Sequence, residues 1–237
     1  LNIKGILLEK PISSNFQKTR EAINTLQKIK IPFIVNFIFT ELVSYKKFQN
    51  ILQKSRPNNL SYNWKFKQAY FKNKIPTWKI NHKLGGGLLK YYGIHAFYHL
   101  VDLLKLNKNT KFNIKEVVLK KKKIIFIKIN FSHKKTNFNL SIDINSNINL
   151  HSITSIINKD KIGLINKKKD WTLGFELFKN KKFSNFTKES RIKLTKKTID
   201  KLILNYKNLN NKKNLKYIDK VLTAHALGER IYKKITF

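Results

Sequence analysis

The sequence contains no cysteine and no methionine, and both absences limit what the protein can be. Without cysteine it can form neither a disulfide nor a thiolate metal site, and it has no thiol nucleophile. This composition suits a reducing compartment, so we expect a cytoplasmic protein. Since the chain begins at Leu1 and not at methionine, we also expect it to be part of a longer protein whose start lies upstream.

Long apolar segments are missing as well. No apolar run approaches the roughly 20 residues that cross a bilayer, and the opening LNIKGILLEKP is broken by charges and a proline, unlike a signal peptide. The sequence therefore predicts no membrane partner. A hydrophobic content of 41% over 237 residues is enough to build one large domain or two smaller ones.

Acidic residues and arginine are scarce beside a large excess of lysine. There are 13 acidic and 50 basic residues, a net charge of +37, and few of the basic residues are arginine. Such a charge is typical of proteins that bind nucleic acid or anionic membranes. Nucleic-acid readers, however, favour arginine gathered on one face, whereas these lysines are spread along the whole chain. We interpret the charge as a solvated surface and expect no specific nucleic-acid partner; a basic nucleic-acid-binding protein is the minority alternative.

The first 40 residues have the pattern of a β-α-β unit. Residues 5–9 form a short apolar run that ends at Lys10, and an amphipathic helix pattern follows. Ser14 and Gln17 have the spacing of a capping box at the start of that helix. A second apolar run at 32–39 completes the unit, and its short connections indicate parallel strands. Lys10 then lies at the carboxyl end of a strand, where open parallel sheets bind ligands.

Beyond residue 105 the hydrophobic period changes to two, as in half-buried antiparallel strands: Ile127, Ile129 and Phe131 alternate with polar residues. The sequence predicts an α/β plus α+β architecture. Residues 1–40 are the end of a Rossmann-type, dinucleotide-binding parallel sheet, and residues 41–237 form a domain with a large, mostly antiparallel open sheet flanked by helices. The other predicted elements are helices at 42–53, 88–104, 189–206 and 216–234, strands at 60–68, 124–132, 138–145, 150–157, 161–166 and 171–178, and hairpin turns at 120–123 and 167–169.

The segment GGGLLKYYGIHAFYHLVDLL, residues 85–104, predicts a helix that opens on three glycines and contains a fourth, Gly93. A glycine inside a helix costs up to about 1 kcal/mol relative to alanine, so something must come close to this backbone, for packing or for function. A lone histidine on such a helix is usually structural, but the glycines raise the odds of a ligand contact. One stripe of the predicted helix contains Tyr91, His95, Tyr98 and Asp102.

Three segments in this order resemble the glucose-fructose oxidoreductase, inositol dehydrogenase and MocA (Gfo/Idh/MocA) family of NAD(P)-dependent sugar oxidoreductases. They are LLEKPIS, IVNFIFTEL and TWKINHKLGGGLLKYYGIHAFYHLVDLL, with a weaker return at LTAHALGERIY. The resemblance implies a homodimeric or homotetrameric enzyme that moves a hydride between NAD or NADP and a secondary alcohol of a sugar or sugar derivative. Most of the cofactor domain would lie upstream of these residues.

The same resemblance implies the roles of single residues. Lys10 and His95 would be catalytic, with His95 as general base and Lys10 as the cation that favours the developing alkoxide. Glu9, Lys10 and Pro11 would lie beside the nicotinamide, and no metal ion is expected. The sugar would contact Lys79, Tyr91 and Tyr98.

Two positions depart from the family pattern. Many members carry aspartate where this sequence has Tyr91 and Tyr98. A non-catalytic relative that uses the same cleft for binding or assembly is therefore the main alternative. The retained Lys10 and His95 favour the enzyme.

Overall fold

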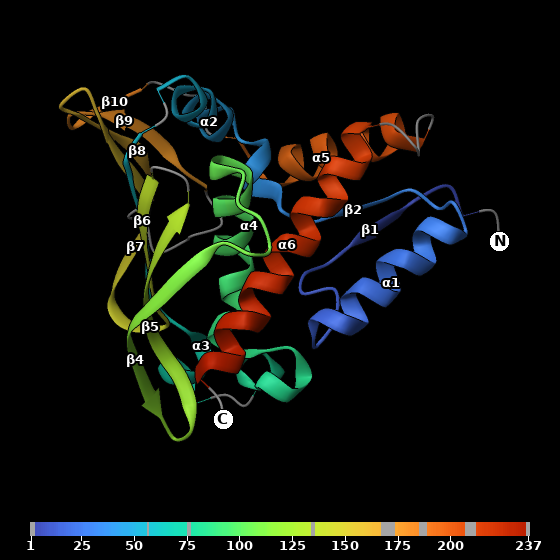
Figure 1. The fold of residues 1–237 in the computed structure, drawn as a ribbon, viewed down its shortest axis with the longest axis horizontal. Helices are drawn as coiled ribbons and strands as arrows, with labels where there is room; N and C mark the ends of the chain where they lie inside the picture. The colour runs from blue at the N-terminus through green and yellow to red at the C-terminus, as the bar shows by residue number, and fades with distance from the viewer. Residues whose placement is uncertain are drawn as a thin grey trace.

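The structure is a computed structural model that describes residues 3–55, 57–74, 77–133, 136–166, 174–184, 189–206 and 212–235. Two sheets of unequal size are connected and covered by helices (Figure 1). The smaller sheet has two parallel strands, and the larger sheet has eight strands that are mostly antiparallel. The predicted combination of α/β and α+β architecture is confirmed.

The smaller sheet belongs to the predicted β-α-β unit. Its elements are β1 (Ile6–Leu8), α1 (Phe16–Lys28) and β2 (Phe33–Val35). The two strands are parallel, with Leu7 opposite Ile34. β2 is shorter than the predicted run over 32–39 because the chain turns into a 3-10 helix, η1 (Ile38–Glu41), soon after it.

The start of α1 differs from the prediction. Its N-cap is Asn15, whose side-chain oxygen accepts a hydrogen bond from the backbone N–H of Lys18 at 2.9 Å. Gln17 donates to Glu21 and forms no capping box with Ser14. Asparagine caps a helix as well as serine does, so the sequence predicts the helix correctly but assigns the wrong capping residue.

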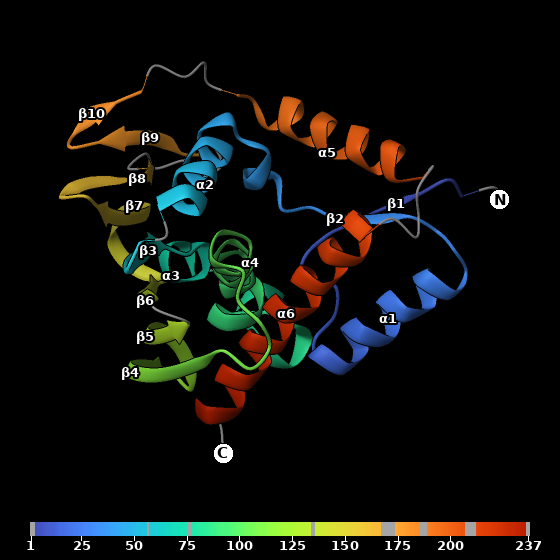
Figure 2. The same cartoon turned by 45° about the horizontal axis from the view of Figure 1, so that its top comes forward.

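The larger sheet has the strand order β10-β9-β8-β7-β3-β6-β5-β4 (Figure 2). Only β3 and β6 pair in parallel among these neighbours. Ile127, Ile129 and Phe131 are buried as predicted. The strands are β3 (Asn59–Lys67), β4 (Lys111–Lys120), β5 (Lys123–His133), β6 (Thr136–Asp143), β7 (Asn145–Ile157), β8 (Asp160–Asn166), β9 (Glu176–Lys179) and β10 (Lys182–Phe183).

Two of these features bear on the sequence-based expectations. The sequence pattern misses β4, because register shifts near Ile114 and Val118 break its period of two. The hairpin turn predicted at 120–123 is confirmed, with positive φ of 50° and 59° at Lys121 and Lys122, as a two-residue hairpin turn requires. The turn predicted at 167–169 and the first residues of the strand predicted at 171–178 lie outside the described residues.

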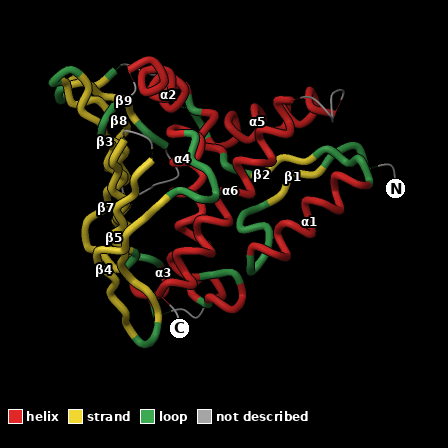
Figure 3. Tube along the Cα trace, in the orientation of Figure 1, coloured by secondary structure: helices red, strands yellow, loops and turns green. Residues whose placement is uncertain are grey.

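Helices cover one face of the larger sheet. α2 (Val43–Ser55) and α4 (Gly93–Leu104) lie on that face, α6 (Lys212–Ile235) packs on the outer side of α4, and the described residues leave the opposite face open (Figure 1, Figure 3). α5 (Arg191–Tyr206) returns to pack against η1, β1 and β2. The described part of the chain contains no helix long and apolar enough to cross a membrane.

The helix predicted over 88–104 is not uniform. Leu88–Tyr92, labelled η4, is π-helical, and α4 begins only at Gly93. A π-turn contains an extra residue, so a spacing of four no longer places Tyr91 directly above His95. The sequence also misses the short elements that precede it, α3 (Ala69–Asn73), η2 (Trp78–Ile80) and η3 (His82–Leu84).

Buried histidines help to fill the space between α4 and the sheet. The Tyr62 hydroxyl lies 3.2 Å from Nδ1 of His99 and 2.7 Å from Nε2 of His151. The His151 ring also stacks on Trp64, with 4.5 Å between ring centroids. Burial lowers the pKa of His99 to about 3, and burial with the nearby His99 lowers the pKa of His151 well below its ordinary value. The imidazoles are therefore neutral in the folded protein.

We predict that the fold loses stability as the pH falls from about 7.5 to about 5. An unfolded histidine takes up a proton near pH ~6.5, whereas burial lowers the pKa of His225 to about 4 in the fold. The unfolded chain therefore binds more protons in this range, and each such histidine lowers the free energy of unfolding by about 2 kcal/mol at pH ~5. Denaturant unfolding at several pH values measures the effect. His225→Leu should remove the contribution of one proton, and an unchanged pH dependence in this variant would contradict the assignment.

Candidate active site at the carboxyl end of β1

Glu9 and Lys10 directly follow β1, at the edge of the small sheet where a ligand of a parallel sheet binds. Glu9 accepts a hydrogen bond from the side-chain amide of Asn36 at 2.6 Å. Asn36 follows β2 directly, so this hydrogen bond joins the ends of the two strands. Glu9 therefore braces the turn and points its carboxylate at Asn36.

Lys10 lies over the ring of Tyr91, with its Nζ 4.4 Å from the ring centroid. The Nζ of Lys79 approaches the same ring at 5.4 Å, and Trp78 packs edge-on against it at 5.2 Å. A cation is attracted to the face of an aromatic ring over such distances. The structure thus brings together three of the predicted site residues, from the end of β1, from η2 and from η4.

The charge of Lys10 is poorly compensated. Burial is the main cause that lowers the pKa of Lys10 to about 8, the positive charges of Lys79 and Arg191 lower it further, and only Glu9 raises it among the described residues that act on it. Arg191 belongs to the first turn of α5 and was not singled out in the sequence. An ammonium group with this pKa exchanges its proton close to neutral pH.

His95 lies deeper, on the first turn of α4, and is 4% exposed. The rings of Phe37 and Trp64 lie edge-on to it at 5.9 Å, and Phe39 lies at 6.4 Å. Neither ring nitrogen of His95 has a hydrogen-bond partner in the structure. Burial, followed by the positive charge of Lys10, holds the pKa of His95 well below its ordinary value. His95 is therefore a neutral imidazole with free hydrogen-bonding capacity, within electrostatic reach of Lys10.

Tyr98, the third predicted sugar-binding residue, lies apart from this group. Its ring stacks on Phe37 with 3.9 Å between centroids, so Phe37 separates it from His95. Tyr98 instead lines a cavity of about 580 Å³ between η1, α2, α4, α5 and α6. The residues of the predicted stripe therefore lie in two different places. Tyr91 and His95 lie near Lys10, whereas Tyr98 and Asp102 line the cavity.

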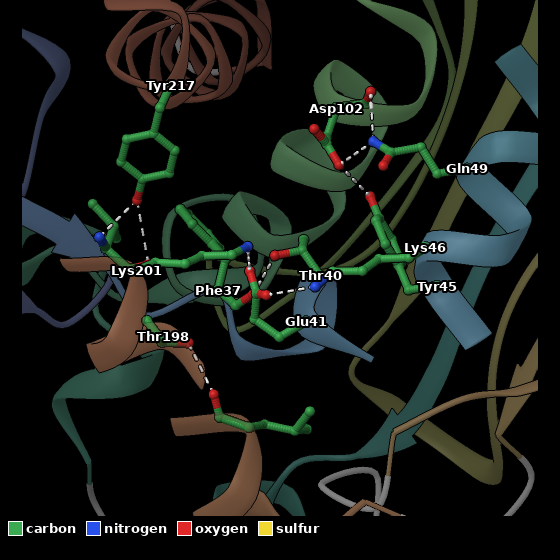
Figure 4. A network of polar contacts seen from close by, with 12 residues as sticks. Phe37, Thr40, Glu41, Tyr45, Lys46, Gln49, Asp102, Thr198, Lys201 and Tyr217 are labelled. Carbon is green, nitrogen blue, oxygen red and sulfur yellow. Dashed lines mark hydrogen bonds and ion pairs between the residues drawn. The ribbon is translucent and has the colours of Figure 1, made fainter. Parts of the chain in front are cut away.

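A polar network borders this cavity (Figure 4). Asp102 accepts hydrogen bonds from Tyr45 at 3.2 Å and from Gln49 at 2.7 Å, and it forms an ion pair with Lys220 of α6. Glu41 forms ion pairs with Lys46 and Lys201. Asp102 and Glu41 are 8% and 6% exposed, and the partners supply the hydrogen bonds that a buried carboxylate needs. The network ties α2, α4, α5 and α6 together behind the site.

Packing within the chain explains the glycines of the segment 85–93. A Cβ on Gly86 would lie 2.1 Å from the carbonyl oxygen of Trp78, so only glycine lets η2 fold back onto this segment. A Cβ on Gly93 would lie 3.0 Å from the Phe97 ring, and one on Gly228 of α6 would lie 3.1 Å from the same ring. These positions therefore need no ligand to account for them. Gly86 in particular lets the backbone of Trp78 and Lys79 pack closely against this segment.

The described residues contain no group of three histidine, aspartate or glutamate side chains that could hold a metal ion.

The comparisons with known proteins bear on the fold. No protein-family model matches the chain, and no curated protein matches its sequence. An aldose-aldose oxidoreductase from Caulobacter crescentus, solved with glycerol, matches with a TM-score of 0.74 at 12% identity, over 97% of this chain and 69% of that one. A 3-ketoreductase from Actinomadura kijaniata, solved with NADP and TDP-benzene, matches with a TM-score of 0.73 at 9% identity, over 97% and 70%. A Gfo/Idh/MocA family oxidoreductase from Vibrio cholerae matches with a TM-score of 0.66 at 14% identity, over 98% and 70%.

The chain therefore has the fold of an oxidoreductase that combines a parallel-sheet unit with a large open sheet. The particular fold is that of the Gfo/Idh/MocA oxidoreductases, and the resemblance stated from the sequence is confirmed at that level. Sequence reasoning missed Asn36, Arg191 and the aromatic rings around His95. Asn36 follows a predicted parallel strand and could have been found from that position, whereas nothing in the sequence links Arg191 to Lys10.

We predict that Asp102→Ala costs about 1–3 kcal/mol in the free energy of unfolding, because it removes the acceptor of the Tyr45 and Gln49 hydrogen bonds and the ion-pair partner of Lys220. Chemical denaturation measures the loss. Asp200→Ala, at an exposed position of α5, is the control and should change the same quantity by no more than about 0.5 kcal/mol. Equal effects of the two substitutions would show that the network does not stabilise the fold.

Proposed function

We propose that the protein is an oxidoreductase that transfers a hydride between NAD or NADP and a secondary alcohol of a sugar or sugar derivative. The observation that carries the proposal is that the half-buried Lys10, at the end of β1, acts electrostatically on His95, which is buried, neutral and without a hydrogen-bond partner. Such perturbed groups gather at catalytic sites more often than elsewhere. Similar folds solved with NADP or a polyol support the same class of reaction.

The residues at this place fit a nicotinamide. Glu9, Lys10 and Pro11 lie at the carboxyl end of a parallel strand, where dinucleotides bind in open sheets. Neither ring nitrogen of His95 has a hydrogen-bond partner, and both are buried, so a substrate hydroxyl would have to reach them past the surrounding aromatic rings. When bound, a nicotinamide supplies the hydride acceptor or donor, and the chain supplies orientation and proton exchange. Residues 1–40 would then belong to the cofactor domain and residues 41–237 to the substrate domain.

We infer a division of work between the two groups that differs from the sequence-based expectation. His95 is neutral, but the causes that keep it neutral also make it a weak base. Lys10, with a pKa lowered to about 8, is better matched to proton exchange near neutral pH. We therefore infer that Lys10 as the free amine takes the hydroxyl proton and that His95 orients the hydroxyl by a hydrogen bond.

We predict that oxidation of the alcohol rises with pH through a pKa of about 8, because Lys10 must lose its proton to act as a base. In the full-length enzyme Lys10→Met should lower kcat by about 10²–10⁴ and remove this limb of the pH profile. His95→Ala should lower kcat by about 10² and keep the limb. Steady-state rates against pH measure both effects.

Lys4→Met is the matched control, since Lys4 is exposed on the same segment, and it should leave the profile unchanged. A limb near pH ~6.5 that disappears in His95→Ala would return the role of base to His95. Wild-type rates in both variants would place the chemistry elsewhere in the protein.

A non-catalytic relative is the second candidate, and one observation favours it. Phe37, Phe39 and Trp64 enclose His95, and tyrosine stands at both positions where the family pattern has aspartate. Such a protein would bind its ligand without turnover. Absence of any nicotinamide-dependent reaction in the full-length protein, with ligand binding retained, would favour this candidate.

We also propose a homodimer or homotetramer that forms through the open face of the large sheet. The described helices leave this face uncovered, and its β3 and β6 positions are half-polar, with Ser61, Asn63, Asn139 and Ser141 in register. A broad uncovered sheet of this kind is a surface for a second copy. The mass of the assembled protein in solution decides between monomer, dimer and tetramer.

A further inference from the structure

We propose that the cavity of about 580 Å³ between η1, α2, α4, α5 and α6 binds an uncharged sugar of one or two rings, at a site separate from that of Lys10 and His95. Neither Lys10 nor His95 lines this cavity, and the stacked rings of Phe37 and Tyr98 stand between it and His95. The inference therefore goes beyond the proposed function and does not depend on it. Small-molecule sites usually have a volume of about 300–1,000 Å³, and this cavity lies within that range.

The Tyr98 hydroxyl is the group that points to a ligand. The residue is 4% exposed and lines the cavity, yet no hydrogen bond in the described part of the chain involves its hydroxyl. Burial, followed by the nearby Tyr217, Asp102 and Glu41, holds the pKa of Tyr98 well above its ordinary value, so the phenol keeps its proton. A buried hydroxyl without a partner is unfavourable, and an oxygen atom of a ligand in the cavity would supply that partner.

The charged side chains of the cavity are paired with one another. Glu41 forms ion pairs with Lys46 and Lys201 (Figure 4), and Asp102 forms one with Lys220. The side chains of Lys46 and Lys201 are each 45% exposed, so water screens the one positive charge that is left over. An ionic ligand would have to compete with one of these ion pairs, whereas an uncharged ligand can bind beside them and leave them intact.

The lining also offers oxygen atoms that can accept further hydrogen bonds. The hydroxyls of Thr40 and Thr198 donate to backbone carbonyls at 2.9 and 3.0 Å, and their lone pairs remain. The Gln49 amide nitrogen donates to Asp102 at 2.7 Å, and the amide oxygen accepts from none of the described residues. A hydroxyl group both donates and accepts, so a molecule with several hydroxyls matches these acceptors and the donor at Tyr98.

Apolar side chains complete the lining of the cavity. Ile34 and Val35 of β2 are buried, whereas Leu204 of α5 is largely exposed. The lining therefore runs from the core to the surface, which gives a ligand a way in. The C–H face of a sugar ring can pack against such side chains while its hydroxyls meet the polar groups, as in sites that combine apolar walls with a few placed polar groups.

The test is isothermal titration calorimetry of the full-length protein, without nicotinamide, with four probes: D-glucose, maltose, D-glucuronate and D-glucosamine. We expect glucose or maltose to bind saturably with a Kd in the millimolar range or lower. The two charged analogues should bind about fivefold more weakly, because each must disturb an ion pair. Tyr98→Phe keeps the ring stack and removes only the hydroxyl, so it should raise Kd for the neutral sugar by about fivefold, as expected for one hydrogen bond. Thr198→Val, on a different helix, should raise it by a similar factor.

Two control variants locate the binding. Tyr70→Phe removes the hydroxyl of a half-buried tyrosine of α3 that does not line the cavity, and it should leave Kd unchanged. Lys10→Met should also leave Kd unchanged, and loss of binding in this variant would move the sugar to the candidate active site and overturn the cavity site.

Three further results would overturn the inference. They are wild-type affinity in both Tyr98→Phe and Thr198→Val, charged analogues that bind as tightly as the neutral sugars, and no saturable binding of either neutral sugar, which would show that the cavity holds only solvent. The titration involves no turnover, so a lack of enzymatic activity would count against the proposed function alone.

Discussion

The site depends on one constraint: the Lys10 ammonium is partly withdrawn from water, and Glu9 offsets only part of the cost. The adjacent Glu9 accepts a hydrogen bond from Asn36, and the Lys10 Nζ lies over the aromatic face of Tyr91. Removing a charge from water is costly unless it is paired, so such a lysine lowers its pKa and releases its proton more easily. Burial, followed by the same charge, keeps His95 neutral. The proton exchange proposed for Lys10 and the neutrality of His95 both depend on this arrangement.

The rest of the fold keeps that arrangement in place. α4 carries His95 at one end and Asp102 at the other, and the Asp102 ion pair with Lys220 fixes α4 against α6. On its other side α4 rests on the sheet through buried aromatic and histidine rings. A buried ion pair adds little net stability compared with apolar packing, but it is expensive to break, so it fixes the position of the helix more than it strengthens the fold.

The sequence predicted the elements that have a clear hydrophobic period and failed where the period breaks. β5 and β6 alternate cleanly and were found, whereas the register shifts of β4 hid that strand. The helix over 88–104 was predicted, but its π-helical first turn was not, because a period of 3.6 gives no sign of an inserted residue. The short elements α3 and η2 begin at local capping hydrogen bonds and are too short to show a hydrophobic period, so the sequence did not predict them.

The site could be predicted only where a motif marks its residues. Lys10, Tyr91 and His95 lie in recognisable segments and are brought near one another, while Tyr98 lies behind Phe37. The charge of Arg191 acts on Lys10 across most of the chain length, and no local sequence pattern encodes such an interaction.

The most direct measurement is the titration of the Lys10 side chain itself. NMR of the protein labelled with ¹³C at the lysine ε-carbon follows each ammonium against pH, and the signal missing from Lys10→Met assigns the residue. We expect Lys10 to titrate with a midpoint near pH 8, in keeping with a pKa lowered to about 8 by burial and by Lys79 and Arg191. A midpoint at the ordinary lysine value of about 10.4 would contradict the partly desolvated ammonium on which the site depends.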